Sequence, residues 1–172
     1  MNYHFRKAEI SESSRIWEIL QQAIQRRKGD GSNQWQDGYP NLDIVKQDIE
    51  KGVGFVLTNR ETIVGYSAVL INDEPEYDKI DGKWLSNGAF VVFHRVAISE
   101  ECLGKGLAKK IIKSIEDFAL DNKIYSVKAD TNFDNVAMMK TFEKCGYSYC
   151  GEVSISGSPR KAYEKVFTHF MG

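Results

Sequence analysis

The chain has 172 residues, of which 42% are hydrophobic and 27% are charged, and its formal net charge is −1. This balance is typical of a globular protein rather than a disordered one, and it offers no long-range attraction to nucleic acid or to an anionic membrane. The sequence has no apolar run near the length of a membrane span, about 18 residues, and no apolar signal-peptide core, so we expect one cytoplasmic domain over residues 1–172.

The first half of the chain alternates between strand and helix patterns, which we read from the spacing of apolar residues. In chain order we expect a strand at 3–9, an amphipathic helix at 11–24, irregular chain over 26–40, a short helix ending at 51, and a strand hairpin at 52–58 and 62–70. The short helix begins at Asn41 or Asp43.

The second half begins with a polar stretch at 72–88, which we expect to form a loop or a short helical insertion. The elements expected after it are a strand at 90–99, a helix at 105–121, a strand at 124–129, a helix at 135–145, and a final strand pair at 147–153 and 161–167 joined by the segment 154–160. These elements predict one α+β domain around a mixed sheet.

A glycine-rich junction separates the strand at 90–99 from the helix that follows, and it reads Leu103-Gly104-Lys105-Gly106-Leu107-Ala108. Amides at a helix start have no carbonyl partner within the helix and can bind an anion such as a pyrophosphate. Lys109 stands where a dinucleotide fingerprint needs its third glycine, and no Ser or Thr follows Gly-Lys as a phosphate-loop NTPase requires. Taken alone, the junction is equally well explained as a tight turn.

A second motif follows one strand later. The strand ends near Asn132, Asn135 lies three residues on, and the next helix closes with Glu143-Lys144-Cys145-Gly146-Tyr147. Asp134 or Asn135 can cap the helix start, and Gly146 suits its left-handed C-terminal cap.

Together the two motifs resemble the GNAT superfamily of N-acetyltransferases, over about residues 55 to 167. The resemblance implies a GNAT-like mixed, mostly antiparallel central sheet with flanking helices, and acetyl-CoA as cosubstrate. Two positions depart from the family pattern. Leu103 replaces the usual Gln or Arg, which leaves the backbone amides in place, and Phe142 replaces the usual tyrosine that acts as general acid.

The resemblance also implies site residues. Two central strands part, so that pantetheine pairs with the backbone of Val96, Ala97 and Ile98, and the Val96 amide binds the thioester carbonyl. The remaining residues expected to bind the cofactor are Leu103, Gly104, Lys105, Gly106, Leu107, Ala108, Asn132, Asn135 and Phe142. Because side chains alternate along a strand, His94, Val96 and Ile98 are expected on one face, with Arg95 and Ala97 on the other.

His94 is the candidate general base, since some family members that acetylate small amines carry a histidine near this position. The alternative is a half-buried structural histidine. Because Phe142 lacks a phenol, either the thiolate takes its proton from water or the product ammonium, or Tyr147 or Tyr149 substitutes.

Two aromatic residues, Trp35 and Tyr39, are candidates for a lid over the acceptor, or they close a loop onto the core. The three cysteines, Cys102, Cys145 and Cys150, lack metal-site or disulfide-framework spacing, and no metal is expected.

The sequence therefore predicts an acetyl-CoA-dependent N-acetyltransferase that acts on an amine of a small molecule or a protein. A non-catalytic acyl-CoA-binding or sensing domain is the alternative, and a nucleotide-binding domain of another kind is a third. We expect neither nucleic acid nor membrane as a partner, and a homodimer is left open.

Overall fold

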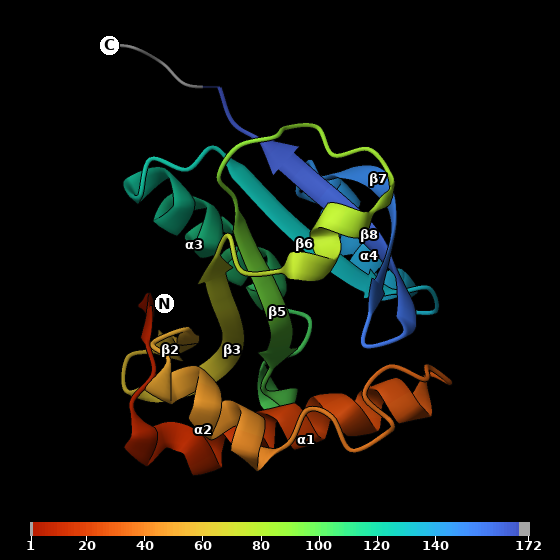
Figure 1. Ribbon diagram of the computed structural model, residues 1–172. Coiled ribbons are helices and arrows are strands. Elements are labelled where there is room, and N and C mark those ends of the chain that lie inside the picture. Colours follow the sequence, from red (N-terminus) through yellow and green to blue (C-terminus); the bar gives the residue numbers. More distant parts are fainter. Residues whose placement is uncertain (1, 169–172) are drawn as a thin grey trace. The chain divides into compact units, whose positions relative to one another are not determined.

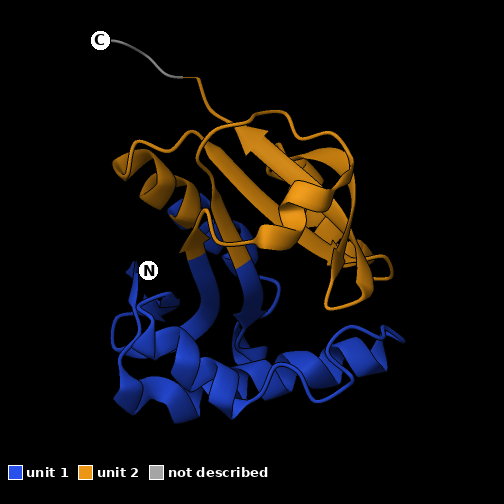
Figure 2. Ribbon diagram, viewed as in Figure 1, with its two compact units in different colours: residues 1–69, 94–114 blue, residues 70–93, 115–172 orange. Residues whose placement is uncertain are grey.

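The computed structural model describes residues 2–168 of the chain (Figure 1). The chain divides into two compact units, each built from two separate stretches of sequence (Figure 2). Unit 1 contains residues 1–69 and 94–114, and unit 2 contains residues 70–93 and 115–172. The expected single domain over residues 1–172 stays a prediction.

Unit 1 packs two helices against antiparallel strands. Its elements are β1 (Tyr3–Lys7), the 3₁₀ turn η1 (Ile10–Glu12), α1 (Ser13–Gly29), α2 (Leu42–Glu50), β2 (Gly54–Asn59), all but the end of β3 (Thr62–Ile71), the second part of β5 (Val91–Ile98), the 3₁₀ turn η3 (Glu100–Cys102) and the start of α3 (Leu107–Asp121). Strand β2 pairs antiparallel with both β1 and β3.

The core of unit 1 follows from helical spacing. The apolar side chains of α1 recur every three or four residues and so form one face, which packs with residues of α2, β2, β3 and β5. The buried set includes Ile16, Ile19, Leu20, Ala23, Val45, Val56, Tyr66 and Ala97. The Asn41 side chain caps α2 by accepting a hydrogen bond from the Ile44 amide at 3.0 Å.

Unit 2 is built around the C-terminal strands. Its elements are the 3₁₀ turn η2 (Pro75–Lys79), the two-residue strand β4 (Asp81–Gly82), the start of β5, the end of α3, β6 (Ser126–Asn132), α4 (Val136–Lys144), β7 (Ser148–Ile155) and β8 (Ser158–Val166). Strand β8 pairs antiparallel with β6 and β7, and β7 pairs antiparallel with β4. Strand β5 pairs parallel with β6.

Apolar side chains cover both faces of this part of the sheet. On one face Ala162 packs with Tyr77 and Val92, under the segment that carries η2. On the other face the neighbouring residue, Tyr163, packs against Phe142 of α4.

Counted through β5, which contributes to both units, the strand order is β1-β2-β3-β5-β6-β8-β7-β4. The sheet is mixed and mostly antiparallel, which confirms the predicted α+β, GNAT-like fold class. Within the described residues, no helix is long and apolar enough to cross a membrane. The same residues contain no cluster of His, Cys, Asp and Glu that could hold a metal ion.

The structure differs from three of the predicted elements. Helix α1 continues to Gly29 instead of ending near residue 24, and the basic residues of its last turn complement the helix dipole. The insertion at 72–88 contains the strand β4 in addition to a short helical turn. The loop expected at 154–160 is only a two-residue turn, because Ser156 and Gly157 both have positive φ angles, 50° and 79°, which match a tight hairpin turn.

Candidate active site

Strands β5 and β6 form a short parallel ladder. Among the described residues it contains two pairs, Val91 with Val127 and Val92 with Lys128. Strand β5 itself continues to Ile98, so most of its length lies beyond this ladder. The predicted parting of the two strands and the predicted pairing of pantetheine with Val96–Ile98 stay predictions.

Strand β5 contains a conformational break at Arg95, whose φ angle is +57°. This left-handed conformation costs a residue with a side chain about 1–2 kcal/mol. The alternation expected for residues 94–98 was therefore wrong, and Val96, Ala97 and Ile98 are all buried. The carbonyl of His94, just before the break, accepts a hydrogen bond from Ser67 Oγ at 3.0 Å.

A buried polar network holds the Arg95 side chain within unit 1. The guanidinium donates to both carboxylate oxygens of Asp48, with Nη2–Oδ1 at 2.8 Å and Nε–Oδ2 at 3.1 Å, and its Nη1 donates to the Tyr39 hydroxyl. The Tyr66 hydroxyl donates to Asp48 Oδ2 at 2.6 Å. Burial and the Asp48 carboxylate raise the pKa of Tyr66, so its proton stays on the phenol.

Neither Arg95 nor Asp48 was predicted from the sequence as a site residue. A usable signal was present, because Asp48 follows buried Val45 by three residues and therefore lies on the apolar face of α2. A charged residue on such a face requires a partner, and Arg95 interrupts an otherwise apolar strand.

The glycine-rich junction has the geometry that an anion site needs. Gly104 and Gly106 have φ angles of +78° and +72°, and a Cβ added at either would meet no atom within 4 Å. These glycines are therefore required by conformation and not by crowding. The first helical bond runs from the Lys110 amide to the Gly106 carbonyl at 3.2 Å, so the amides of residues 107–109 precede the helix ladder. The residues present fit a diphosphate at this end of α3.

Helix α1 holds the segment that leads into this junction. Three polar side chains on α1 bond to the end of β5 and to η3, all within unit 1. The contacts are Arg26 Nη2 to Ile98 O, the Glu100 amide to Gln22 Oε1, and Arg15 Nη2 to Glu101 Oε1, each at 2.8 Å. The start of the predicted diphosphate loop is thus fixed at several points, while Leu107, 2% exposed, anchors its end.

The second motif forms a capped helix in unit 2. Asn135 Oδ1 accepts a hydrogen bond from the Met138 amide at 3.2 Å, which makes Asn135 the N-cap of α4. The Asn132 side-chain amide donates to Asp134 at 2.8 Å. At the other end Gly146 has a φ of +90°, and the amides of Gly146 and Tyr147 donate to the carbonyls of Glu143 and Phe142. This is the expected left-handed C-terminal cap.

Phe142 lies in the core of unit 2, where it is 1% exposed. Its ring lies 5.0 Å from that of Tyr163 and 6.0 Å from those of Phe93 and Tyr147. The Tyr147 hydroxyl donates to Glu116 Oε2 at 3.0 Å, and burial raises its pKa. Tyr147 is therefore a core residue with an occupied hydroxyl.

The predicted lid residues pack inward within unit 1. Trp35 is 7% exposed and belongs to the core, and the Arg27 guanidinium stacks over its ring at 3.8 Å. Tyr39 packs at the edge of that core and binds Arg95. These contacts match the alternative that the aromatics close a loop onto the core, and an acceptor-binding role stays a prediction.

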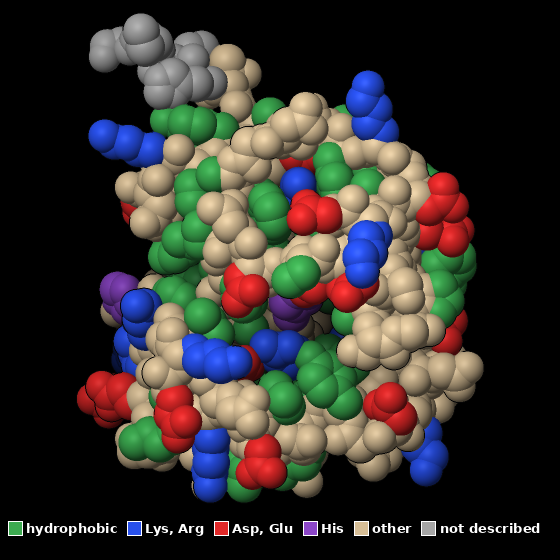
Figure 3. All heavy atoms as spheres, in the orientation of Figure 1, with side chains coloured by type: hydrophobic (Ala, Val, Ile, Leu, Met, Phe, Trp, Pro, Cys, Tyr) green, Lys and Arg blue, Asp and Glu red, His purple; other side chains and the backbone are tan. Residues whose placement is uncertain are grey.

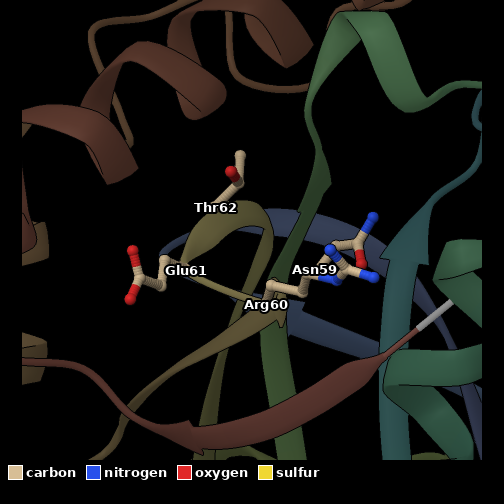
Figure 4. Close-up of a pocket in the computed structure, with 4 residues that line it drawn as sticks. All are labelled: Asn59, Arg60, Glu61 and Thr62. Atoms are coloured by element: carbon tan, nitrogen blue, oxygen red, sulfur yellow. The ribbon is translucent and has the colours of Figure 1, made fainter.

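A shallow pocket also lies at the β2–β3 turn, lined by Asn59, Arg60, Glu61 and Thr62. In Figure 4 the side chains of Glu61 and Arg60 point in opposite directions, so they do not converge on a common ligand. On the face drawn in Figure 3, acidic and basic side chains are interspersed, in keeping with the net charge of −1.

Comparison with known proteins identifies the class. The acetyltransferase (GNAT) family matches residues 16–147, which is more than half of the chain, so the chain belongs to this family. No curated protein matches it.

Solved structures agree with this assignment. A GNAT-family acetyltransferase from Streptococcus agalactiae is 34% identical, with 97% of this chain and 96% of that chain covered and a TM-score of 0.89. A GNAT-family acetyltransferase from Listeria monocytogenes shares the fold at 20% identity, with coverage of 96% and 95% and a TM-score of 0.74. YncA from Salmonella typhimurium, solved with its cofactor acetyl-CoA, shares the fold at 15% identity, with coverage of 100% and 98% and a TM-score of 0.69.

Proposed function

We propose that the protein is an acetyl-CoA-dependent N-acetyltransferase that transfers an acetyl group to an amine of a small molecule or of a protein. Acetyl-CoA is the cosubstrate of the family to which the chain belongs. The observation that carries the proposal is the pair of left-handed glycines, Gly104 and Gly106, which open α3 with three amides ahead of its helix ladder.

The diphosphate of the cosubstrate binds at residues 103–108, where backbone N–H groups that precede the helix ladder donate to phosphate oxygens and the helix dipole adds a favourable potential. Pantetheine lies along Val96, Ala97 and Ile98 of β5. The Val96 amide donates to the thioester carbonyl and stabilises the negative charge that develops on its oxygen.

Acetyl transfer forms a bond between the acceptor nitrogen and the carbonyl carbon, and it breaks the bond from that carbon to sulfur. His94 accepts the proton that the amine loses, directly or through a water molecule. The departing thiolate takes its proton from water once His94 holds the amine's proton, or it takes that proton directly from the ammonium nitrogen of the tetrahedral intermediate. Two observations favour this route: Phe142 has no hydroxyl, and the Tyr147 hydroxyl is bonded to Glu116.

On the acceptor side, the loop that contains Trp35 and Tyr39 contributes apolar surface. The proposal includes a cytoplasmic location and no nucleic-acid or membrane partner, and a homodimer is compatible with it.

The second candidate is a non-catalytic acyl-CoA binder. Phe142 favours it, because the position expected to carry the general acid is an apolar residue in the core. Release of free thiol from acetyl-CoA, measured with a panel of primary amines, separates the two. Turnover above the amine-free background supports the transferase, and binding of acetyl-CoA without turnover supports the binder. If CoA and acetyl-CoA give no heat of binding to the folded protein, both fail.

A further inference from the structure

Arg95 combines two features that are rarely found in one residue. It is an arginine in the left-handed conformation, at φ +57°, in the middle of strand β5. It is also largely buried, with its side chain 11% exposed. A strained conformation at a residue other than glycine persists only where the surrounding structure determines it from several directions.

Three separate segments of unit 1 make the contacts that hold Arg95 in this conformation. Asp48 of α2 binds the guanidinium through two parallel hydrogen bonds, and Tyr39 of the 34–40 loop accepts a third. Tyr66 of β3 holds Asp48 in place at 2.6 Å. Each nitrogen of the guanidinium therefore has an acceptor, which is what burial of this charge requires.

The next peptide unit after Arg95 carries the amide of Val96. The ψ angle of Arg95 sets the direction of that amide. The two hydrogen bonds to Asp48 fix the Arg95 side chain and thereby restrain the backbone of the same residue. A regular strand residue would direct the same N–H differently, because neighbouring amides in a strand point to opposite sides.

We infer that Arg95, clamped by Asp48, is a positioning residue that aims the Val96 amide at the thioester carbonyl. Tyr39 ties the loop with the predicted acceptor residues to the same guanidinium, so one clamp holds the donor strand and the acceptor loop. This inference rests on the proposed function, since it assumes that acetyl-CoA binds along β5.

The experiment measures the stretching vibration of the thioester carbonyl. Acetyl-CoA labelled with carbon-13 at that carbonyl is bound to the full chain, and its stretching band, which moves to lower wavenumber when the oxygen accepts a hydrogen bond, is recorded by infrared difference spectroscopy. Arg95→Gly removes the clamp and frees the backbone, because glycine adopts left-handed and extended conformations equally well. Asp48→Asn keeps the side-chain volume and removes the charge.

In both variants we expect the band to move back toward that of free acetyl-CoA. The dissociation constant of CoA should stay within about threefold of the wild-type value, because the diphosphate loop is unchanged. With any amine that supports turnover, kcat should fall about 10- to 100-fold, as expected for a misdirected group, while KM for acetyl-CoA changes little.

Val45→Ala is the matched control. It removes buried apolar volume from the same helix, three residues before Asp48, and lowers the melting temperature, but it leaves every hydrogen bond of Arg95 and Asp48 in place. We expect it to retain the wild-type band. If Arg95→Gly does not fold, Asp48→Asn carries the test alone.

Two results would overturn the inference. The band could stay at its wild-type position in both folded variants, or Val45→Ala could shift it as far as they do, which would mean that the shift reports only a loss of stability. Wild-type protein that fails to bind CoA refutes the proposed function instead, and the inference falls with it.

Discussion

Replacement of Gly106 by alanine tests the diphosphate loop directly. The φ angle of Gly106 is +72°, a conformation that costs a residue with a Cβ about 1–2 kcal/mol. The added methyl group meets no atom within 4 Å, so no steric contribution adds to that penalty. The whole effect is therefore conformational.

The conformational penalty of Gly106→Ala must lower either the stability of the folded protein or its affinity for CoA. If the loop keeps its conformation, the protein loses stability, partly offset by about 0.4–1 kcal/mol from the lower entropy of the unfolded alanine chain. If the exposed loop relaxes in the free protein, the penalty is incurred on binding instead. Because residues 104–106 are exposed, we expect relaxation and a CoA dissociation constant raised about 5- to 30-fold, the equivalent of 1–2 kcal/mol.

Isothermal titration calorimetry with CoA and thermal unfolding measure the two quantities. Gly29→Ala is the control, since Gly29 is the last residue of α1, has no positive φ, and likewise has no atom within 4 Å of an added Cβ. Alanine is favoured over glycine in a helix by up to about 1 kcal/mol, so this variant should be slightly more stable and bind CoA normally. A Gly106→Ala protein with wild-type affinity and wild-type melting temperature would refute the role assigned to the loop.

Three further predictions concern separate parts of the molecule. His94→Gln should lower kcat and leave CoA binding unchanged; an undiminished rate at every pH would remove His94 as the base. Phe142→Tyr should not raise kcat and should lower the melting temperature, because a hydroxyl without a partner in the core costs about 1–3 kcal/mol; an equally stable and faster enzyme would contradict its placement. Hydrogen bonds from Ser99, from its own backbone amide and from Arg15 lower the pKa of Glu101 to about 2, from an ordinary 4.5. The carboxylate therefore stabilises the fold above pH 4.5 and loses this effect as the pH falls through about 2. In differential scanning calorimetry the small deficit of Glu101→Gln should be constant above pH 4.5 and shrink below it, and a deficit that grows in acid would show the sign to be wrong.

The features that the sequence predicted correctly depend on local interactions. The glycine-rich turn at 104–106, the left-handed cap at Gly146 and the N-cap at Asn135 involve partners within about five residues along the chain, so residue type and spacing are sufficient to predict them. The same holds for the hairpin of β2 and β3 and for the amphipathic face of α1. Two such motifs in the right order were enough to indicate the family.

The tertiary structure alone decided which polar and aromatic residues are held together. Arg95 and Asp48 are 47 positions apart, and Tyr39 and Arg95 are 56 apart, so no local pattern links them. The break in the alternation of β5 follows from that distant pairing. Phe142 and Trp35 likewise have spacing that suits either a ligand contact or a core position, and only packing against residues from other elements placed them in the two cores. Local chemistry thus specified the backbone amides that a diphosphate needs, while the direction of the Val96 amide depends on contacts that form only when distant segments of the chain meet.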